Sequence, residues 1–252
     1  MVGKAIFITG ASSGIGEAVA KECAARGYRL GLAARREAEL ARVKQEIQAT
    51  HPETYVETAV LDVTEYGQIP VVFADLKERM GEIDIVFVNA GVSWPGMIGE
   101  GHFDQFRRII ETNLIGAMAT IDMASTYFKT RGQGHVVVIS SVAGWRGLPD
   151  SSAYSASKMG LEGFVQSAQS QFAFNRRIKF TLIAPGFIET PMVEHIRTRP
   201  FELTPEQGAK KMMNVVERGA RYACVPWMPW RLLKPFMLLM PNWAVNLIAR
   251  QR

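Results

Sequence analysis

The sequence predicts an α/β fold built on an open, doubly wound and mainly parallel sheet with helices on both faces. Apolar, strand-like runs alternate with helix-like segments along most of the chain, and most of these runs are continuously apolar. A strand that helices cover on both faces shows this continuous pattern, and strand–helix–strand alternation is typical of right-handed crossovers in a parallel sheet. A chain of 252 residues with 48% hydrophobic residues can form one such domain.

Each expected element follows from the local pattern. The expected strands are residues 5–9, 29–34, 56–62, 83–89, 135–140 and 179–184, with a shorter one at 222–226. The expected helices are residues 15–26, 37–49, 65–80, 103–129 and 152–175. No internal repeat, low-complexity tract or linker interrupts them, so we expect a single domain over 1–252. Ligands of such sheets bind beyond the carboxyl ends of the strands, where candidate site residues are sought first.

The charge is unevenly distributed. Residues 1–175 carry 16 basic and 19 acidic groups, whereas residues 176–252 carry 13 basic and 5 acidic groups. This is either a solvated basic surface or a docking face for a phosphorylated ligand, an acidic carrier protein or an anionic membrane. No motif indicates nucleic-acid binding. Cys23 and Cys224 form no metal-ligand cluster and the first residues lack a secretory pattern, which favours a reduced, cytoplasmic setting without a metal.

The first expected strand runs into the loop TGASSGIG, residues 9–16. Gly10 can adopt a positive φ in a tight turn, and Gly14 and Gly16 let a ligand or the next helix approach closely. The free N–H groups and the positive dipole end of that helix favour a pyrophosphate. The loop is therefore a candidate phosphate cradle that includes Ser12, Ser13 and Ile15.

The spacing of these glycines resembles the cofactor loop of the short-chain dehydrogenase/reductase family. Further motifs follow in the family's order, so that the resemblance spans about residues 3–190: NAG (89–91), Asn113, SS (140–141), YSASK (154–158) and PGFIET (185–190). The resemblance implies a Rossmann-type sheet of seven strands in the order 3-2-1-4-5-6-7, a nicotinamide cofactor and interconversion of a carbonyl and an alcohol. By analogy it also implies a homodimer or homotetramer.

The end of the second strand bears on the choice of cofactor. An acidic residue there holds the ribose hydroxyls of NAD, but this chain has Ala34, followed by Arg35 and Arg36. A guanidinium binds a 2′-phosphate that a carboxylate would repel, and Ser13 can add a hydroxyl. We therefore expect NADP(H) rather than NAD(H).

The resemblance assigns further cofactor contacts. Asp62 receives the adenine amino group, although a helix cap or a turn former is the alternative, and Val63 offers its backbone beside it. A small-residue loop next to the ribose consists of Asn89, Ala90 and Gly91. Pro185 and Gly186 make a turn, after which the Ile188 backbone and the Thr190 hydroxyl orient the nicotinamide amide.

The expected catalytic group is a tyrosine beside a lysine. Carbonyl reduction needs a proton donor, which Tyr154 can be if a nearby cation lowers its pKa. Lys158 lies one helical turn further on the same face and can also hold the ribose. Ser141, with Ser140 as the alternative, can polarise the substrate oxygen. The resemblance gives Asn113 the role of interrupting a helix and extending the proton relay.

Apolar side chains near this centre predict an apolar carbonyl or alcohol substrate. They are Val92, Trp94, Met97, Trp145, Phe187 and Met192. Residues 191–213 are expected to form a variable substrate lid. The apolar, proline-interrupted segment 227–252 is expected to pack on a partner subunit, complete the pocket, lie on a membrane surface as a peripheral contact, or join the core.

Two other functions remain open at this stage. One is a reductase of 3-ketoacyl thioesters on an acidic carrier, which the basic last third permits. The other is a non-catalytic NADPH-binding sensor or scaffold, which the complete set of catalytic residues disfavours.

Overall fold

Across residues 3–249, seven parallel strands form a single sheet. The structure is a computed structural model that describes residues 3–249. The strand order is β3-β2-β1-β4-β5-β6-β7, which confirms the expected parallel sheet and its order. The strands are Ala5–Thr9 (β1), Arg29–Ala34 (β2), Val56–Val60 (β3), Ile85–Val88 (β4), Gly134–Ile139 (β5), Ile178–Pro185 (β6) and Tyr222–Val225 (β7).

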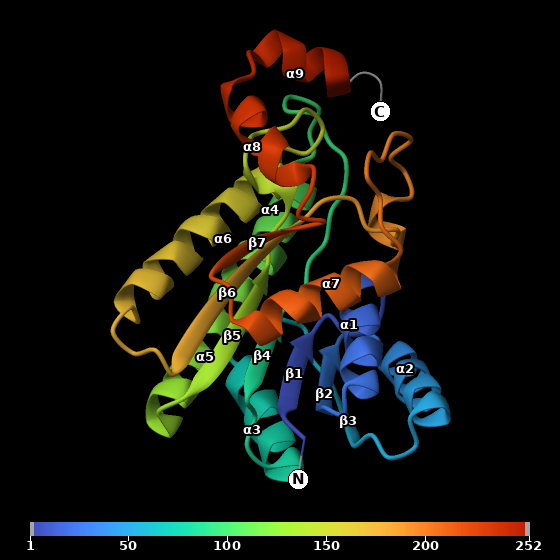
Figure 1. The fold of residues 1–252 in the computed structure, drawn as a ribbon. Helices are drawn as coiled ribbons and strands as arrows, with labels where there is room; N and C mark the ends of the chain where they lie inside the picture. Colours follow the sequence, from blue (N-terminus) through green and yellow to red (C-terminus); the bar gives the residue numbers. More distant parts are fainter. Residues whose placement is uncertain (1–2, 250–252) are drawn as a thin grey trace.

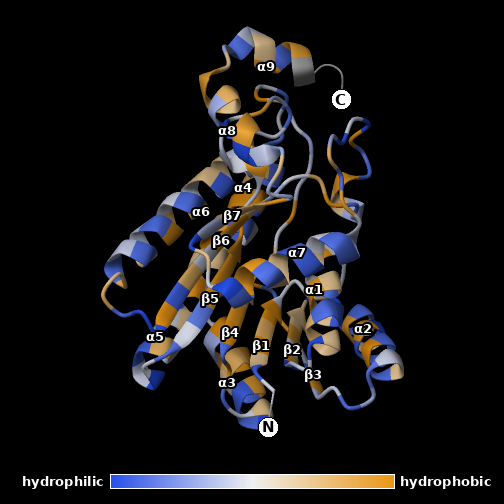
Figure 2. Cartoon of the chain, in the orientation of Figure 1, coloured by the Kyte–Doolittle hydropathy of each residue, from blue (hydrophilic) through white to orange (hydrophobic). Residues whose placement is uncertain are grey.

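Helices cover both faces of the sheet (Figure 1). One face packs against α1 (Gly14–Ala25), α2 (Glu37–Thr50) and α7 (Pro205–Arg218), and the other against α3 (Gln68–Met80), α5 (Ala117–Arg131) and α6 (Ser152–Gln171). In β1, Ile6 and Ile8 join the first core while Ala5 and Phe7 join the second. Both sets of side chains are buried, which explains the continuously apolar strands that Figure 2 shows in orange.

The segment predicted as one helix over 103–129 is interrupted. Helix α4 is Phe103–Ile110, a π-helical stretch covers Glu111–Gly116, and α5 begins at Ala117. The buried side chain of Asn113 lies in the π stretch. Its Oδ1 accepts a hydrogen bond from the Val92 N–H at 2.8 Å, and its Nδ2 donates to the Val92 carbonyl at 2.8 Å. The extra residue in the turn brings the amide to the loop after β4, in agreement with the expected interruption at Asn113.

The last third contains helices that the sequence pattern did not reveal. Helix α7 begins after a capping box in which Thr204 and Gln207 exchange side-chain and backbone hydrogen bonds. Its residues Met212 and Met213 are buried against α1. Residues 205–213, part of the predicted lid, therefore belong to a helix whose inner face packs into the core. Two short helices follow, α8 (Trp230–Leu239) and α9 (Asn242–Ala249). Within residues 3–249, none of the helices combines the length and apolar character needed to cross a bilayer.

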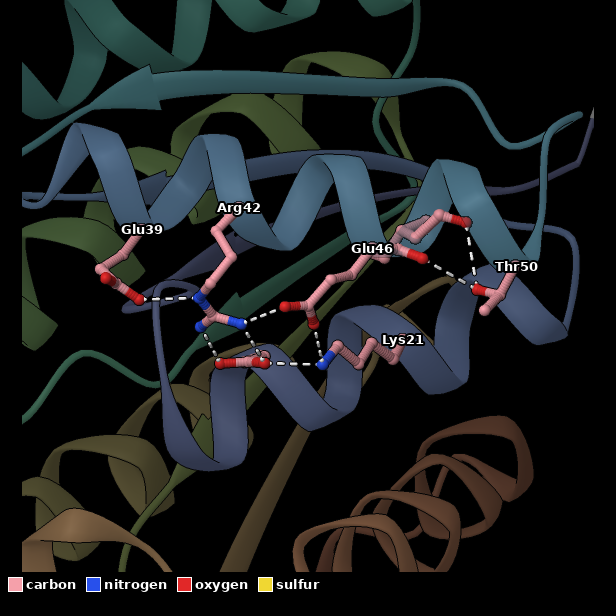
Figure 3. A network of polar contacts seen from close by, with 7 residues as sticks. Lys21, Glu39, Arg42, Glu46 and Thr50 are labelled. Carbon is pink, nitrogen blue, oxygen red and sulfur yellow. Dashed lines mark hydrogen bonds and ion pairs between the residues drawn. The ribbon is translucent and has the colours of Figure 1, made fainter.

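A network of ion pairs joins α1 to α2 (Figure 3). The Arg42 guanidinium binds the carboxylates of Glu17, Glu39 and Glu46 at 2.8–2.9 Å, and the Lys21 ammonium binds Glu17 and Glu46 at 2.7 Å. Burial acts to raise the pKa of Glu17, but the hydrogen bonds from Arg42 and Lys21 outweigh it and hold that pKa below its ordinary value. The network fixes α1, which begins at the candidate phosphate loop.

Candidate functional site

The loops at the carboxyl ends of the strands surround a cavity of about 400 Å³. The strand order reverses between β1 and β4, which leaves the crevice where open α/β sheets bind ligands. The predicted residues that line it are Gly10, Ser12, Ser13, Gly14, Ile15, Arg35, Arg36, Asp62, Val63, Asn89, Ala90, Gly91, Ser141, Tyr154, Lys158, Pro185, Gly186, Phe187, Ile188, Thr190 and Met192. The fold thus brings together the end of β1 and motifs more than 170 residues further along the chain.

The glycine positions of the phosphate-loop candidate leave little room for side chains. Gly10 and Gly14 have φ values of 69° and 58°, in the region that favours glycine. A Cβ at Gly16 would lie 2.2 Å from the Gly10 carbonyl oxygen, so Gly16 supports the loop from behind the cavity. Asn89 Nδ2 donates to the carbonyls of Thr9 and Gly10 at 3.0 and 3.2 Å. Its side chain therefore holds the loop in shape. Helix α1 begins at Gly14, so its free N–H groups face this side of the cavity.

Two arginines form a basic edge beside this loop. Arg36 Nη2 donates to the hydroxyls of Ser12 and Ser13 at 3.0 and 2.6 Å. Arg35 Nη1 lies 3.7 Å from an Asp62 carboxylate oxygen, and its side chain is 61% exposed. The other Asp62 oxygen accepts hydrogen bonds from the Thr64 N–H and hydroxyl, so Asp62 forms a turn and does not cap α3, which begins at Gln68. Among the described lining residues Asp62 is the one carboxylate, so this end of the cavity suits a phosphate.

Tyr154 and Lys158 face the cavity from α6. Burial raises the pKa of Tyr154, and the side chain of Ser141 hydrogen-bonds it and acts in the opposite direction. Lys158 Nζ lies 5.7 Å from the centre of the Tyr154 ring and donates to the Ile139 carbonyl at 2.9 Å. Burial lowers the pKa of Lys158 to about 8. The lowering of the Tyr154 pKa by Lys158 and the positive nicotinamide ring stays a prediction; in the protein alone burial has the largest effect on this pKa, and the ammonium points to a carbonyl.

The two serines at the end of β5 are differently engaged. Ser141 Oγ accepts a hydrogen bond from the Ala143 N–H at 3.1 Å and lies beside Tyr154. The Ser140 hydroxyl donates to the Glu162 carboxylate at 3.0 Å. This arrangement favours Ser141 as the serine available to a ligand. Glu162 was not predicted, although it lies one helical turn beyond Lys158. Burial raises the pKa of Glu162.

Asn113 lies behind the cavity wall. Besides its bonds to Val92, its Nδ2 lies 3.4 Å from Ser157 Oγ, which donates to the Tyr154 carbonyl at 2.7 Å. Asn113 therefore connects the loop after β4 to the turn of α6 that carries Tyr154 and Lys158.

The substrate end of the cavity differs from the expectation. Val92, Phe187 and Met192 line it, but Trp94, Met97 and Trp145 do not. The structure places Trp145 in a buried cluster, where its Nε1 donates to the Tyr222 hydroxyl at 2.8 Å. Trp94 and Met97 are exposed because the loop after β4 carries them outward.

Two residues of α8 take their place. Trp230 and Met237 line the cavity, so the C-terminal segment completes its wall as one of the expected alternatives proposed. The Trp230 indole lies over Gly186, where a Cβ would approach Nε1 to 2.1 Å. Without a side chain at Gly186, α8 packs directly on the turn after β6.

Comparison with known proteins agrees with this geometry. The family model described as short chain dehydrogenase matches residues 4–200. An uncharacterized oxidoreductase of Mycobacterium tuberculosis is 38% identical over 237 residues, 94% of this chain and 93% of that protein.

Two solved structures share the fold. An alcohol dehydrogenase of Thermococcus sibiricus, complexed with 5-hydroxy-NADP, superposes with a TM-score of 0.78 and 27% identity, covering 88% of this chain and 95% of that one. A short-chain dehydrogenase/reductase of Burkholderia phymatum, in complex with NAD, has a TM-score of 0.83 at 22% identity, covering 95% and 96%. The chain belongs to the short-chain dehydrogenase/reductase family of oxidoreductases.

Proposed function

We propose that this protein interconverts a carbonyl and an alcohol with NADP(H), with Tyr154 as acid and base. The observation that carries the proposal is the convergence of Tyr154, Ser141 and Lys158 on the cavity that also contains the glycine-rich loop. A bound nicotinamide supplies the hydride in such chemistry, and the protein supplies the proton transfer and the orientation.

Three side chains have distinct roles in this proposal. The Tyr154 hydroxyl gives a proton to the substrate oxygen in reduction and takes it in oxidation. Ser141 hydrogen-bonds the same oxygen and already opposes the rise in the tyrosine pKa. Lys158 has a pKa of about 8 and therefore exchanges its own proton near neutral pH. This property suits a residue that restores the proton of Tyr154.

The basic edge supports NADP(H) over NAD(H). Arg35 and Arg36 line the cavity, and Arg36 already organises the hydroxyls of Ser12 and Ser13 toward a shared position. A 2′-phosphate would gain charge-assisted hydrogen bonds from this set. The glycine loop and the start of α1 would hold the pyrophosphate.

The lining beyond Tyr154 supports an apolar substrate. Side chains there are mostly apolar, and they include Val92, Pro95, Leu148, Phe187, Met192, Trp230 and Met237. Such a wall favours a hydrophobic ketone or aldehyde, or the corresponding alcohol.

The test is an NADPH-oxidation screen over ketones, aldehydes, quinones and 3-ketoacyl thioesters, with NADH in parallel. Tyr154→Phe should still bind NADPH, measured by quenching of tryptophan fluorescence, but lose at least about a hundredfold in turnover. Tyr55→Phe is the matched control, because Tyr55 is exposed, and this variant should keep full activity. Near-normal turnover by Tyr154→Phe would refute the mechanism, and NADPH binding without turnover of any substrate would favour a sensor.

A further inference from the structure

The C-terminal helices expose an unusual amount of apolar surface. The side chains of Trp227, Leu232, Phe236, Leu239, Trp243 and Leu247, here called the tail surface, are between 50% and 84% exposed. Figure 1 shows α8 and α9 together at one end of the molecule, far from the N-terminus, and Figure 2 shows orange segments on both. An exposed cluster of large apolar side chains is unusual for a soluble monomer and indicates an interaction site.

Helix α8 is apolar both toward the protein and away from it. Trp230 and Met237 face inward and line the cavity, whereas Phe236 and Leu239 are 69% and 84% exposed. Large apolar side chains that a helix exposes on its outer face indicate contact with a second apolar environment. The helices have 10 and 8 residues, far short of the roughly 20 that span a bilayer. They can therefore lie in an interface but not cross it.

Charge distinguishes between the partners that could cover this surface. The segment that contains α8 and α9, residues 227–252, has four basic side chains and no acidic one. The Arg231 guanidinium lies 4.4 Å from the centre of the Trp227 ring, so a cation and an aromatic ring stand side by side at the start of α8. Two copies of this surface would bring like charges together, whereas an anionic lipid headgroup layer attracts them. Aromatic and cationic side chains together suit the boundary between headgroups and acyl chains.

We propose that α8 and α9 dock this protein on an anionic lipid bilayer through the tail surface. The two helices are held as one unit, because Arg146 donates to carbonyl oxygens of Met237 and Met240 at the end of α8 and to the side chain of Asn242 at the start of α9. Arg146 lies in the loop that follows Ser141. The docked surface is thereby fixed relative to the catalytic loop, and the protein binds lipid without rearranging its fold.

Sedimentation with vesicles tests the proposal directly and requires no turnover. The protein should bind vesicles of phosphatidylcholine with phosphatidylglycerol, and much less those of phosphatidylcholine alone. Phe236→Ser with Trp243→Ser should lower the partition coefficient roughly tenfold for each side chain removed from lipid. Phe174→Ser is the matched control, because Phe174 is fully exposed in the turn after α6 and should not affect binding. Arg231→Gln should reduce the preference for the anionic vesicles.

The same samples give the outcomes that overturn the proposal. Thermal midpoints equal to that of the wild type show that the double variant is folded. No binding of the wild type to anionic vesicles, or equal losses for the double variant and Phe174→Ser, rejects the lipid surface. If the wild type ignores vesicles and elutes as an oligomer on size-exclusion chromatography that the double variant dissociates, the surface instead binds a second copy.

Discussion

Replacing Lys158 by Met should make the free protein more stable while impairing its catalysis. The Lys158 side chain is 4% exposed, and the described ion pairs do not include it. Its ammonium has one hydrogen bond, to the Ile139 carbonyl, and it is attracted by Glu162 from a distance. Burial therefore destabilises the charged form of Lys158 by more than the hydrogen bond and the attraction of Glu162 stabilise it. Methionine has nearly the same length and volume without the charge, so it should fill the same space.

The size of the effect follows from the pKa. Lowering the lysine pKa from 10.5 to about 8 on folding corresponds to a penalty of about 3 kcal/mol at neutral pH. Because the folded pKa is the lower one, the penalty is complete below pH 8, shrinks as pH rises from about 8 to 10.5, and is nearly absent above that. Losing the hydrogen bond to Ile139 costs about 1 kcal/mol. The net gain at pH 7 is then about 2 kcal/mol, or about 5 °C in the thermal midpoint for a chain of this size.

The assay is thermal unfolding without cofactor at pH 7 and at pH 10.5. The midpoint of Lys158→Met should exceed that of the wild type at pH 7, and the difference should vanish or change sign at pH 10.5. Lys211→Met, an exposed lysine on α7, is the control and should match the wild type at both pH values. A Lys158→Met midpoint at or below the wild type at pH 7, or a gain that does not depend on pH, would refute the reasoning.

Three further outcomes are expected. Gly186→Ala should destabilise the protein by about 1–3 kcal/mol in denaturant titration, because its Cβ would lie 2.1 Å from the Trp230 indole nitrogen; an unchanged midpoint would contradict the tight packing of α8. Glu17→Gln should lower stability by about 1 kcal/mol at pH 7. The folded pKa of Glu17 is the lower one, so this loss should shrink as pH falls below about 4.5 and disappear below the folded pKa, and a loss that does not depend on pH in this range would contradict the assignment. Arg35→Ala should raise the KM for NADPH at least about tenfold and leave that for NADH within about twofold; equal changes in steady-state kinetics would count against a phosphate site.

Much of the sheet was predictable because its strands are buried on both faces and so are apolar throughout. The helix limits were harder to predict. The extra residue of the π stretch leaves the apolar periodicity of 103–129 almost unchanged, so it has to be inferred from Asn113. Helix α7 carried a usable signal, since Thr204 and Pro205 are typical of a helix start and Met212, Met213 and Val216 have helical spacing.

Helix α8 was harder still, because Pro229 and Pro235 indicate a break. Pro235 lies inside the helix and is tolerated because the Arg231 carbonyl that it leaves unpaired belongs to an exposed residue.

The residues of the candidate site also divide into those that the sequence could predict and those that it could not. Residues that directly follow strands could be predicted, because the end of a strand fixes their position at one edge of the sheet. Trp145 and Trp230 could not be distinguished from the sequence, since both are apolar and only the packing of α8 decides which one lines the cavity. The direction of the Tyr154 pKa also depends on burial, which no local pattern records.

The origin of the cavity wall has a consequence for how this enzyme could diverge. The family model ends at residue 200, whereas Trp230 and Met237 lie well beyond it. The residues proposed for proton transfer and phosphate binding therefore belong to the part shared with the family, whereas two residues of the proposed substrate wall belong to the terminal segment. Exchange of that segment between relatives, by recombination or in a chimera, offers a route to new substrate preferences that leaves the chemical machinery intact.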